Sequence, residues 1–169
     1  MEPQFSASGP LLGTVLEIFI ASAAMAKMMS RPTVRALPRK GLEGDRYFFG
    51  RGTFSPKPQK TDFELTLIED EKIAAFAAKS GIAFSGTDAR RNVVTKGVNL
   101  NELVGQEFYL GKVRIRGIRL CEPCAHLASL SVPAILKGLV HQGGLRAQIL
   151  SEGQIRVGDE IRLAVAPDS

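Results

Sequence analysis

Alternating apolar and polar positions mark several short strands in the chain. Residues 63–67 alternate in this way, while residues 14–21, TVLEIFIA, are predicted as a strand because they are rich in β-branched side chains, and residues 34–37 are a further strand candidate. Two further segments, residues 104–110 and 157–163, each begin with Val-Gly and continue as an alternating strand. Many short strands with glycine turns and few helices predict a mostly β fold, built as a closed or nearly closed barrel.

Helical periodicity appears in two places. From Glu69 the apolar residues Ile73 and Phe76 fall on one helical face, and Gly81 follows as a suitable end for the helix. A second helix is predicted over residues 131–144, with a proline in its first turn and two glycines at its end. The chain is therefore expected to be β with a few short helices.

The strand around residues 112–120 changes its pattern in the middle. Its first half places basic residues on one face, namely Lys112, Arg114 and Arg116. After Gly117 the alternation reverses, so that Ile118 and Leu120 would fall on the basic face. A β-bulge at Gly117 would turn these apolar residues back toward the core.

Composition and charge narrow the class of protein. The 169 residues are 44% hydrophobic and 23% charged, which is typical of a globular protein, and the length suits one domain over residues 1–169 with its core at about 11–163. The net charge of +5 favours anionic partners such as phosphates. No Trp and two Tyr leave little aromatic surface for base stacking, so nucleic acid is not expected as a partner.

The most apolar stretch, Leu11 to Met29, does not look like a membrane span. It contains Glu17 and Lys27 and lacks a basic leader, which also argues against a secretory signal. A chain with two cysteines has no disulfide scaffold of the secreted kind. We therefore expect a cytoplasmic protein without membrane contact, whose thiols stay reduced.

Both cysteines lie in IRLCEPCAHL, directly after the strand described above, and four interpretations stay open. A zinc site would need further ligands, and the spacing of Cys121 and Cys124 to His126 and His141 matches no common zinc finger. A thioredoxin-like disulfide exchanger fits the CEPC motif but not its late position after a hairpin. A single working thiol is favoured if a helical turn begins at Pro123, because Cys124 would then lie among N–H groups that stabilise a thiolate. A buried structural cysteine is the fourth interpretation.

Several motifs, taken in order, resemble the MOSC domain, the family named after the C-terminal domain of molybdenum-cofactor sulfurases. These motifs are GLEGDRYFFG, LTLIEDE, ARRNVVTKGVNLNELVGQEFYLGKVRIRGIRLCEPCAHL and GGLRAQILSEGQIRVGDEIRL. The resemblance runs from about residue 11 to residue 163. It implies a mostly β domain with a barrel-like core, occurring here as a standalone member.

The resemblance also implies roles for individual residues. In cofactor-binding members with a CxxC motif the second cysteine is the molybdenum ligand, and this position corresponds to Cys124. Cys121 matches the first cysteine and is included as a candidate catalytic residue. The arginine before the family's N-V/I-V strand contacts the pterin phosphate, and it corresponds to Arg90, with Arg91 and Asn92 adjacent. The Asp-Arg pair before an aromatic residue corresponds to Asp45 and Arg46.

The expected function follows from these correspondences. The chain would bind a molybdenum–pterin cofactor, or would carry sulfur for it as a persulfide on Cys124. In the first case it is expected to be an oxidoreductase acting on small N-hydroxylated substrates, and in the second a sulfur transferase linked to the pyridoxal phosphate of a partner cysteine desulfurase. The segment 50–62, which has two glycines, two prolines and three basic residues, is expected to be a loop that closes over the pocket. The alternatives are thiol–disulfide exchange through the CxxC pair, and a non-enzymatic anion-binding module based on the basic strand.

Overall fold

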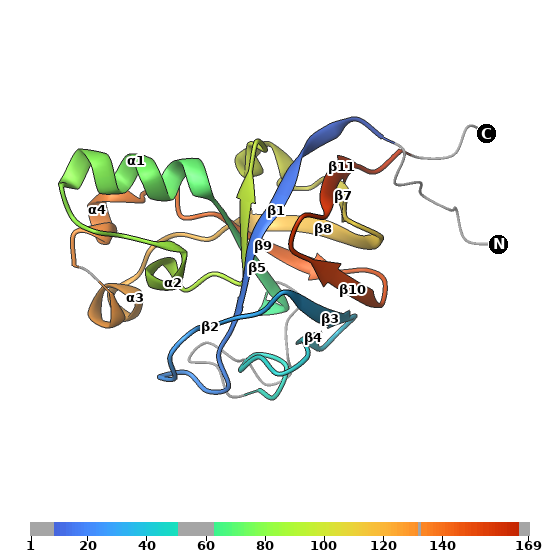
Figure 1. Cartoon of the computed structure of the whole chain (residues 1–169), viewed down its shortest axis with the longest axis horizontal. Coiled ribbons are helices and arrows are strands. Elements are labelled where there is room, and N and C mark those ends of the chain that lie inside the picture. The colour runs from blue at the N-terminus through green and yellow to red at the C-terminus, as the bar shows by residue number, and fades with distance from the viewer. Residues whose placement is uncertain (1–8, 51–62, 132, 166–169) are drawn as a thin grey trace.

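The structure is a computed structural model of the chain, and it describes residues 9–50, 63–131 and 133–165. Most of the segment expected to close over the pocket, residues 51–62, lies outside the described residues. The strands and helices follow one another along the chain as Figure 1 shows. The strands are β1 (Leu11–Ile20), β2 (Met29–Ser30), β3 (Thr33–Leu37), β4 (Gly41–Leu42), β5 (Leu65–Glu69), β6 (Val93–Lys96), β7 (Glu107–Leu110), β8 (Val113–Leu120), β9 (Leu145–Ile149), β10 (Gly153–Arg156) and β11 (Glu160–Leu163). The helices are α1 (Asp70–Ser80), α2 (Gly86–Ala89), the 3₁₀ helix η2 (Leu100–Leu103), α3 (Ala125–Leu130) and α4 (Ile135–Gly138).

Seven strands of the described part form a closed barrel. Their order is β11-β7-β8-β9-β5-β6-β1, and the pairing of β11 with β1 closes the ring. Strand β2 pairs antiparallel with the last two residues of β1, and β10, β3 and β4 form a separate small sheet beside the barrel. All barrel pairs are antiparallel except β5 with β6, which are connected through α1 and α2. The predicted mostly β, barrel-like fold is confirmed.

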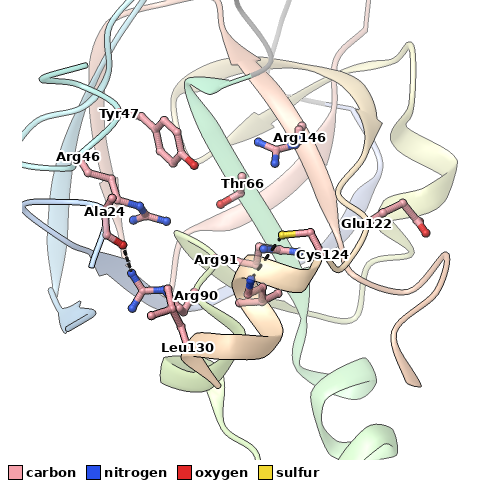
Figure 2. Close-up of a pocket in the computed structure, with 11 residues that line it drawn as sticks. Ala24, Arg46, Tyr47, Thr66, Arg90, Arg91, Glu122, Cys124, Leu130 and Arg146 are labelled. Carbon is pink, nitrogen blue, oxygen red and sulfur yellow. Dashed lines mark hydrogen bonds between the residues drawn. The ribbon is translucent and has the colours of Figure 1, made fainter. Parts of the chain in front are cut away.

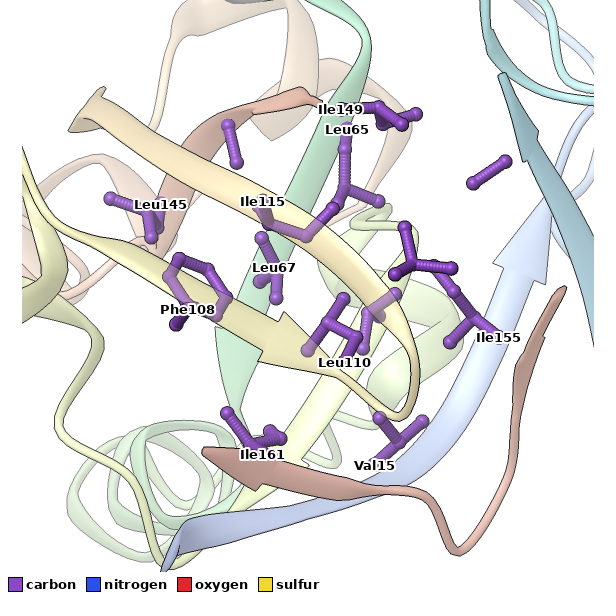
Figure 3. Packing of buried hydrophobic residues seen from close by; sticks show 14 of the residues in the cluster. Val15, Leu65, Leu67, Phe108, Leu110, Ile115, Leu145, Ile149, Ile155 and Ile161 are labelled. Carbon is purple, nitrogen blue, oxygen red and sulfur yellow. The ribbon is translucent and has the colours of Figure 1, made fainter. Parts of the chain in front are cut away.

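The inside of the barrel is filled by alternate residues of its strands, as Figure 3 shows. Phe108, Ile115 and Leu67 are fully buried in this cluster and come from three different strands. Residues of the small sheet, such as Ile155, belong to the same cluster. Burial of this many aliphatic and aromatic side chains is the main source of stability for a domain of this size.

A second apolar cluster lies outside the barrel, where the helices gather beside β5, β6 and β1 (Figure 1). It joins outward residues of the barrel wall, such as Ile68 and Val94, to Phe76 of α1 and Leu139 near α4. Strand β5 is therefore buried on both faces, because its inward residues belong to the barrel core and Ile68 belongs to this second cluster. None of the helices in the described residues has the length and apolar character that a membrane crossing requires.

The local predictions held for the first helix and failed for the second. Helix α1 buries Ile73 and Phe76 and ends at Gly81, which adopts a left-handed conformation and donates a hydrogen bond to the Ala77 carbonyl. The single helix predicted over residues 131–144 is wrong, since α4 covers only Ile135–Gly138. Beside α4 the ring of Phe76 takes the space that a side chain at Gly138 would need.

The predicted bulge in β8 is present. The register between β8 and β9 shifts between Gly117 and Arg119, so β8 bends there. Glycine at position 117 also allows the end of η2 to pack closely against β8, because a Cβ at this position would overlap the Leu103 carbonyl. The two apolar residues after the bulge, Ile118 and Leu120, are only half-buried, so the bulge does not return them fully to the core.

One buried carboxyl group makes the stability of the fold depend on pH. Glu64 is 1% exposed, and burial raises its pKa to about 7 even though the Arg39 backbone N–H donates a 2.8 Å hydrogen bond to its Oε1. The folded state thus keeps the Glu64 proton at pH values where the unfolded chain has lost it. The contribution is fully present below about pH 4.5 and is lost as the pH rises to about 7.

We therefore expect Glu64→Gln to flatten this part of the pH profile. In the wild type the free energy of unfolding should fall by up to about 3 kcal/mol between pH 4.5 and 7.5 from this group, since one pKa unit corresponds to about 1.4 kcal/mol. The glutamine variant lacks the ionisable group and should lose that slope. Urea unfolding at several pH values measures it, and Glu43→Gln at an exposed position serves as the control. Equal slopes in wild type and Glu64→Gln would contradict the prediction.

Candidate functional site

A pocket lies on the outer wall of the barrel, between the second apolar cluster and the small sheet. Figure 2 shows arginine side chains entering it from several directions, with the sulfur of Cys124 at one edge. The space between the lining atoms is narrow, with a volume of about 40 Å³ for the centres of water-sized molecules, and it is partly open to solvent. The lining residues are Ala24, Arg46, Tyr47, Thr66, Arg90, Arg91, Glu122, Cys124, Leu127, Leu130 and Arg146.

Cys124 is placed at the pocket by the end of β8 and the start of α3. It is the residue before the helix, in an extended conformation, and its Sγ accepts a hydrogen bond from the Leu127 backbone N–H at 3.5 Å. The helix begins at Ala125, so the expected helical turn from Pro123 does not form, and Cys124 caps the helix instead of lying within it. Its side chain is half-buried, with one side against the second apolar cluster and the other facing the pocket.

Cys121 has a different environment. It is fully buried and does not line the pocket. Its backbone N–H donates to the Gly144 carbonyl at 2.8 Å, and its own carbonyl accepts from Arg91 Nη2 at 3.2 Å. Both cysteines are free thiols. The structure therefore separates a buried thiol from an accessible one, although only two residues lie between them.

The adjacent Arg90 and Arg91 line the pocket, but both donate hydrogen bonds to backbone carbonyls. Arg91 is 7% exposed and donates to the Gly143 carbonyl at 2.9 Å, in addition to the Cys121 carbonyl. Arg90, in the left-handed conformation at the end of α2, donates to the carbonyls of Ala26 and Ala24 at 3.0 and 3.1 Å. Burial lowers the pKa of Arg90, and the positive charge of Arg46 lowers it further.

Arg46 enters the pocket from the side opposite Cys124, and an ion pair with the adjacent Asp45 holds its guanidinium in place. Its Nη1 lies 3.1 Å from Asp45 Oδ1, and its guanidinium lies over the Tyr47 ring with 4.9 Å to the centroid. Asp45 is fully buried and does not line the pocket. Its carboxylate also accepts from the backbone N–H groups of Ala21 and Tyr47, so Asp45 fixes the turn that presents Arg46.

Asn92 has a similar supporting position. Its side-chain oxygen accepts from the backbone N–H and the hydroxyl group of Thr66, each at 3.1 Å, and its Nδ2 donates to the Phe19 carbonyl. It thereby connects β5 to β1 and orients Thr66, which lines the pocket. Of the sequence-predicted residues, Cys124, Arg46, Arg90 and Arg91 meet in the pocket, whereas Cys121, Asp45 and Asn92 lie behind them.

Three further residues line the pocket without having been predicted from the sequence, namely Arg146, Tyr47 and Thr66. Arg146 is the second residue of β9, and its guanidinium lies over the ring of Phe63, 4.8 Å from the centroid. The signal that points to it is a basic residue on an apolar strand, directly after the Gly-Gly segment. That signal alone does not distinguish a pocket residue from an ordinary surface arginine.

Glu122 lies at the pocket edge, but its carboxylate points away from the open space (Figure 2). The carboxylate accepts from the His141 backbone N–H at 3.0 and 3.1 Å. His141 is exposed and does not line the pocket, while the side chain of His126 lies outside the described part. Among the described residues, no three His, Cys, Asp or Glu side chains gather where they could hold a metal ion.

These features define a small β-barrel protein with an arginine-lined pocket beside an accessible cysteine. A family model of the MOSC domain matches residues 45–162, which is well over half of the chain. The chain belongs to the MOSC domain family.

Two solved structures share the fold of this chain. The YuaD protein from Bacillus subtilis has a TM-score of 0.74 at 16% identity, covering 92% of this chain and 97% of that one. YiiM from Geobacillus stearothermophilus has a TM-score of 0.67 at 15% identity over 90% of this chain and 75% of that one. At these identities the likeness concerns the fold alone. A search of curated proteins found no match.

The difference in burial between the two thiols predicts their reactivity. Under native conditions iodoacetamide should label Cys124 only, because Cys121 is fully buried and becomes reachable only when the structure opens. Mass spectrometry of the intact protein should show one adduct, and a second one after denaturation. Cys121→Ser should keep the native adduct and Cys124→Ser should lose it. Labelling of both thiols at similar rates in the folded protein would contradict the assignment.

Proposed function

We propose that this MOSC protein handles a molybdenum–pterin cofactor through Cys124, either by holding the metal with the thiolate or by carrying sulfur for it. The observation that carries the proposal is the position of the Cys124 sulfur at the edge of a pocket lined by four arginines. A thiolate is a soft donor that suits molybdenum, and guanidinium groups suit the phosphate of the pterin.

The residues present fit such a ligand. Among the residues that the structure describes, Nε and Nη1 of Arg146 are buried without a hydrogen-bond partner, and the side chain lines the pocket, so these donors are not used by the protein. Arg46 carries a second positive charge on the opposite wall. Cys124 would ligate the metal, and the arginines would hold the anionic part of the cofactor. Molybdenum supplies the two-electron redox chemistry when it is bound, which suits reduction of a small N-hydroxylated substrate.

The same geometry supports sulfur carrying. In that case the Cys124 thiolate attacks the outer sulfur of a persulfide on a cysteine desulfurase, the partner that uses pyridoxal phosphate. A new S–S bond forms on Cys124, the S–S bond of the donor breaks, and the donor leaves as a thiolate. The half-buried position of Cys124 leaves one side of its sulfur open for this attack. A cytoplasmic location would keep the thiol reduced.

Other observations weigh against the two alternatives. The CEPC segment follows β8, which forms antiparallel pairs with both its neighbours, and does not begin the helix of a βαβ unit as a thioredoxin-like motif would, which weighs against disulfide exchange. An anion site on the basic strand is weakened because Arg114 and Arg116 both face Glu107, at 4.0 and 3.1 Å. The pocket differs from the basic strand in gathering four guanidinium groups around one space.

The proposal is tested by the content of freshly purified protein from a molybdenum-replete host. Wild type should contain either about one molybdenum and one pterin per chain, or a persulfide that adds one sulfur to Cys124. Cys124→Ala should lose either, because it removes the reacting sulfur, while Cys121→Ala with a correct fold should keep it. Elemental analysis, pterin fluorescence and intact mass measure these quantities. The proposal fails if the wild type holds neither, or if Cys124→Ala holds as much as the wild type.

A further inference from the structure

Arg146 occupies the centre of a polar row on the outer wall of the barrel. In the sheet register it lies opposite Thr66 of β5 on one side and opposite Arg119 of β8 on the other. Its strand neighbours Leu145 and Ala147 point into the barrel core, so Arg146 points outward, into the pocket (Figure 2). A charged residue here is therefore not part of the barrel packing.

Arg146 differs from the other arginines of the pocket in its hydrogen bonds. Arg90 and Arg91 each donate to two backbone carbonyls, and Arg46 is paired with Asp45. Within the described residues Arg146 has no ion pair, and its Nε and Nη1 are buried without any hydrogen-bond partner. Its one contact of note is the stacking of its guanidinium on Phe63.

Arg146 as a whole is half-buried, but its two buried nitrogens without partners are costly in a protein that binds nothing there. Buried charged donors are almost always paired, because taking them out of water without a partner is unfavourable. The placement of Arg119 directly opposite in the ladder adds a like charge, which is also unfavourable. An anion in the pocket would relieve both effects at once, whereas nothing in the described fold requires a positive charge at this position.

The charge of the pocket indicates which anion fits. Four guanidiniums line it, and two carboxylates, those of Asp45 and Glu122, lie beside them. Two positive charges are left unmatched before the thiol of Cys124 is counted. A phosphoryl group with two negative charges matches this surplus better than a carboxylate with one, and its oxygens suit the planar guanidinium fork.

We propose that Arg146 is the residue that binds a phosphoryl group of the pocket's ligand, with Arg90 and Arg91 serving mainly to shape the pocket. The inference rests on the proposed function insofar as it places this group in the same pocket as Cys124. It assigns the phosphate contact to a residue different from the one that the sequence resemblance indicated, Arg90. The Arg146 guanidinium lies over the Phe63 ring, and Arg46 lines the same pocket from another side.

The test compares thermal unfolding of wild type, Arg146→Met and Arg146→Lys with and without inorganic phosphate. Wild type should gain about 3 °C in Tm in phosphate over sodium chloride of equal ionic strength, because a ligand that binds the folded state stabilises it. Arg146→Met keeps the apolar contact with Phe63 and removes the charge. It should lose the phosphate gain and should unfold at a higher temperature than wild type in chloride. Arg146→Lys should keep only part of the gain, because an ammonium group lacks the fork.

Two controls separate this site from general basic charge. Arg116→Met removes an exposed arginine that pairs with Glu107 on the basic strand, and it should respond to phosphate as wild type does. Sodium acetate of equal ionic strength should give wild type little gain. The proposal is overturned if Arg146→Met responds to phosphate like wild type, if Arg116→Met loses the response, or if acetate equals phosphate. It is also overturned if Arg146→Met is less stable than wild type in chloride, which would mark Arg146 as a structural residue.

The result can be told apart from that of the cysteine experiment. Cys124→Ala removes the reacting sulfur but leaves Arg146 in place, so it should keep the phosphate response. A phosphate response that depends on Arg146, together with no molybdenum and no persulfide, would support this inference and reject the proposed function. Molybdenum or a persulfide that is lost in Cys124→Ala, together with a phosphate response that does not depend on Arg146, would support the proposed function and reject this inference.

Discussion

The pocket depends on the two hydrogen bonds of one buried arginine. Arg91 follows α2 and donates to the carbonyls of Cys121 and Gly143, which lie 30 and 52 residues away in the chain. These bonds hold together three segments: the start of β6, the turn that carries Cys124, and the Gly-Gly loop that leads to Arg146. Hydrogen bonds from a charged donor are stronger than neutral ones, and loss of this donor would leave two buried carbonyls unpaired. The positions of Cys124 and Arg146 relative to one another therefore depend on Arg91.

The barrel could be predicted from the sequence because its signal is local. The β-branched residues of β1, the alternation before and within β5, and the alternating strands after the Val-Gly turns, β7 and β11, are all local patterns, and the latter two strands pair with each other. The helix predicted over residues 131–144 does not form as predicted, because this segment makes contacts with residues that are distant in the sequence. Gly143 and Gly144 were expected to end that helix. Instead, the Gly143 carbonyl accepts a hydrogen bond from Arg91, and Gly144 lies so close to the Leu67 carbonyl that a side chain would not fit. Glycine at such a position is ambiguous until its neighbours are known.

In the candidate site, too, the residue types could be predicted from local motifs, whereas the contacts between distant residues could not. Cys124, Arg46, Arg90 and Arg91 could be named from motifs and do line one pocket, but their hydrogen bonds could not be foreseen. The carbonyls that Arg90 binds belong to Ala24 and Ala26, more than 60 residues earlier in the chain. Arg146 looked like an ordinary outward residue of a strand. Only its position between Thr66 and Arg119, over Phe63, distinguishes it from a solvated surface arginine.

The arginines of the pocket thus differ in role, and the hydrogen bonds that each one makes determine whether it supports the structure of the pocket or can bind a ligand. An arginine whose donors are used by the backbone rigidifies a site and contributes long-range positive potential, but it has few hydrogen bonds to offer a ligand. An arginine that packs on an aromatic ring and lacks partners reduces stability until an anion arrives, a cost that folded proteins tolerate at binding sites. Within the part of the chain that the structure describes, Arg91 is of the first kind and Arg146 of the second. Because both act beside Cys124, the same pocket can hold its sulfur in a fixed place while leaving one strong donor free for an anionic ligand.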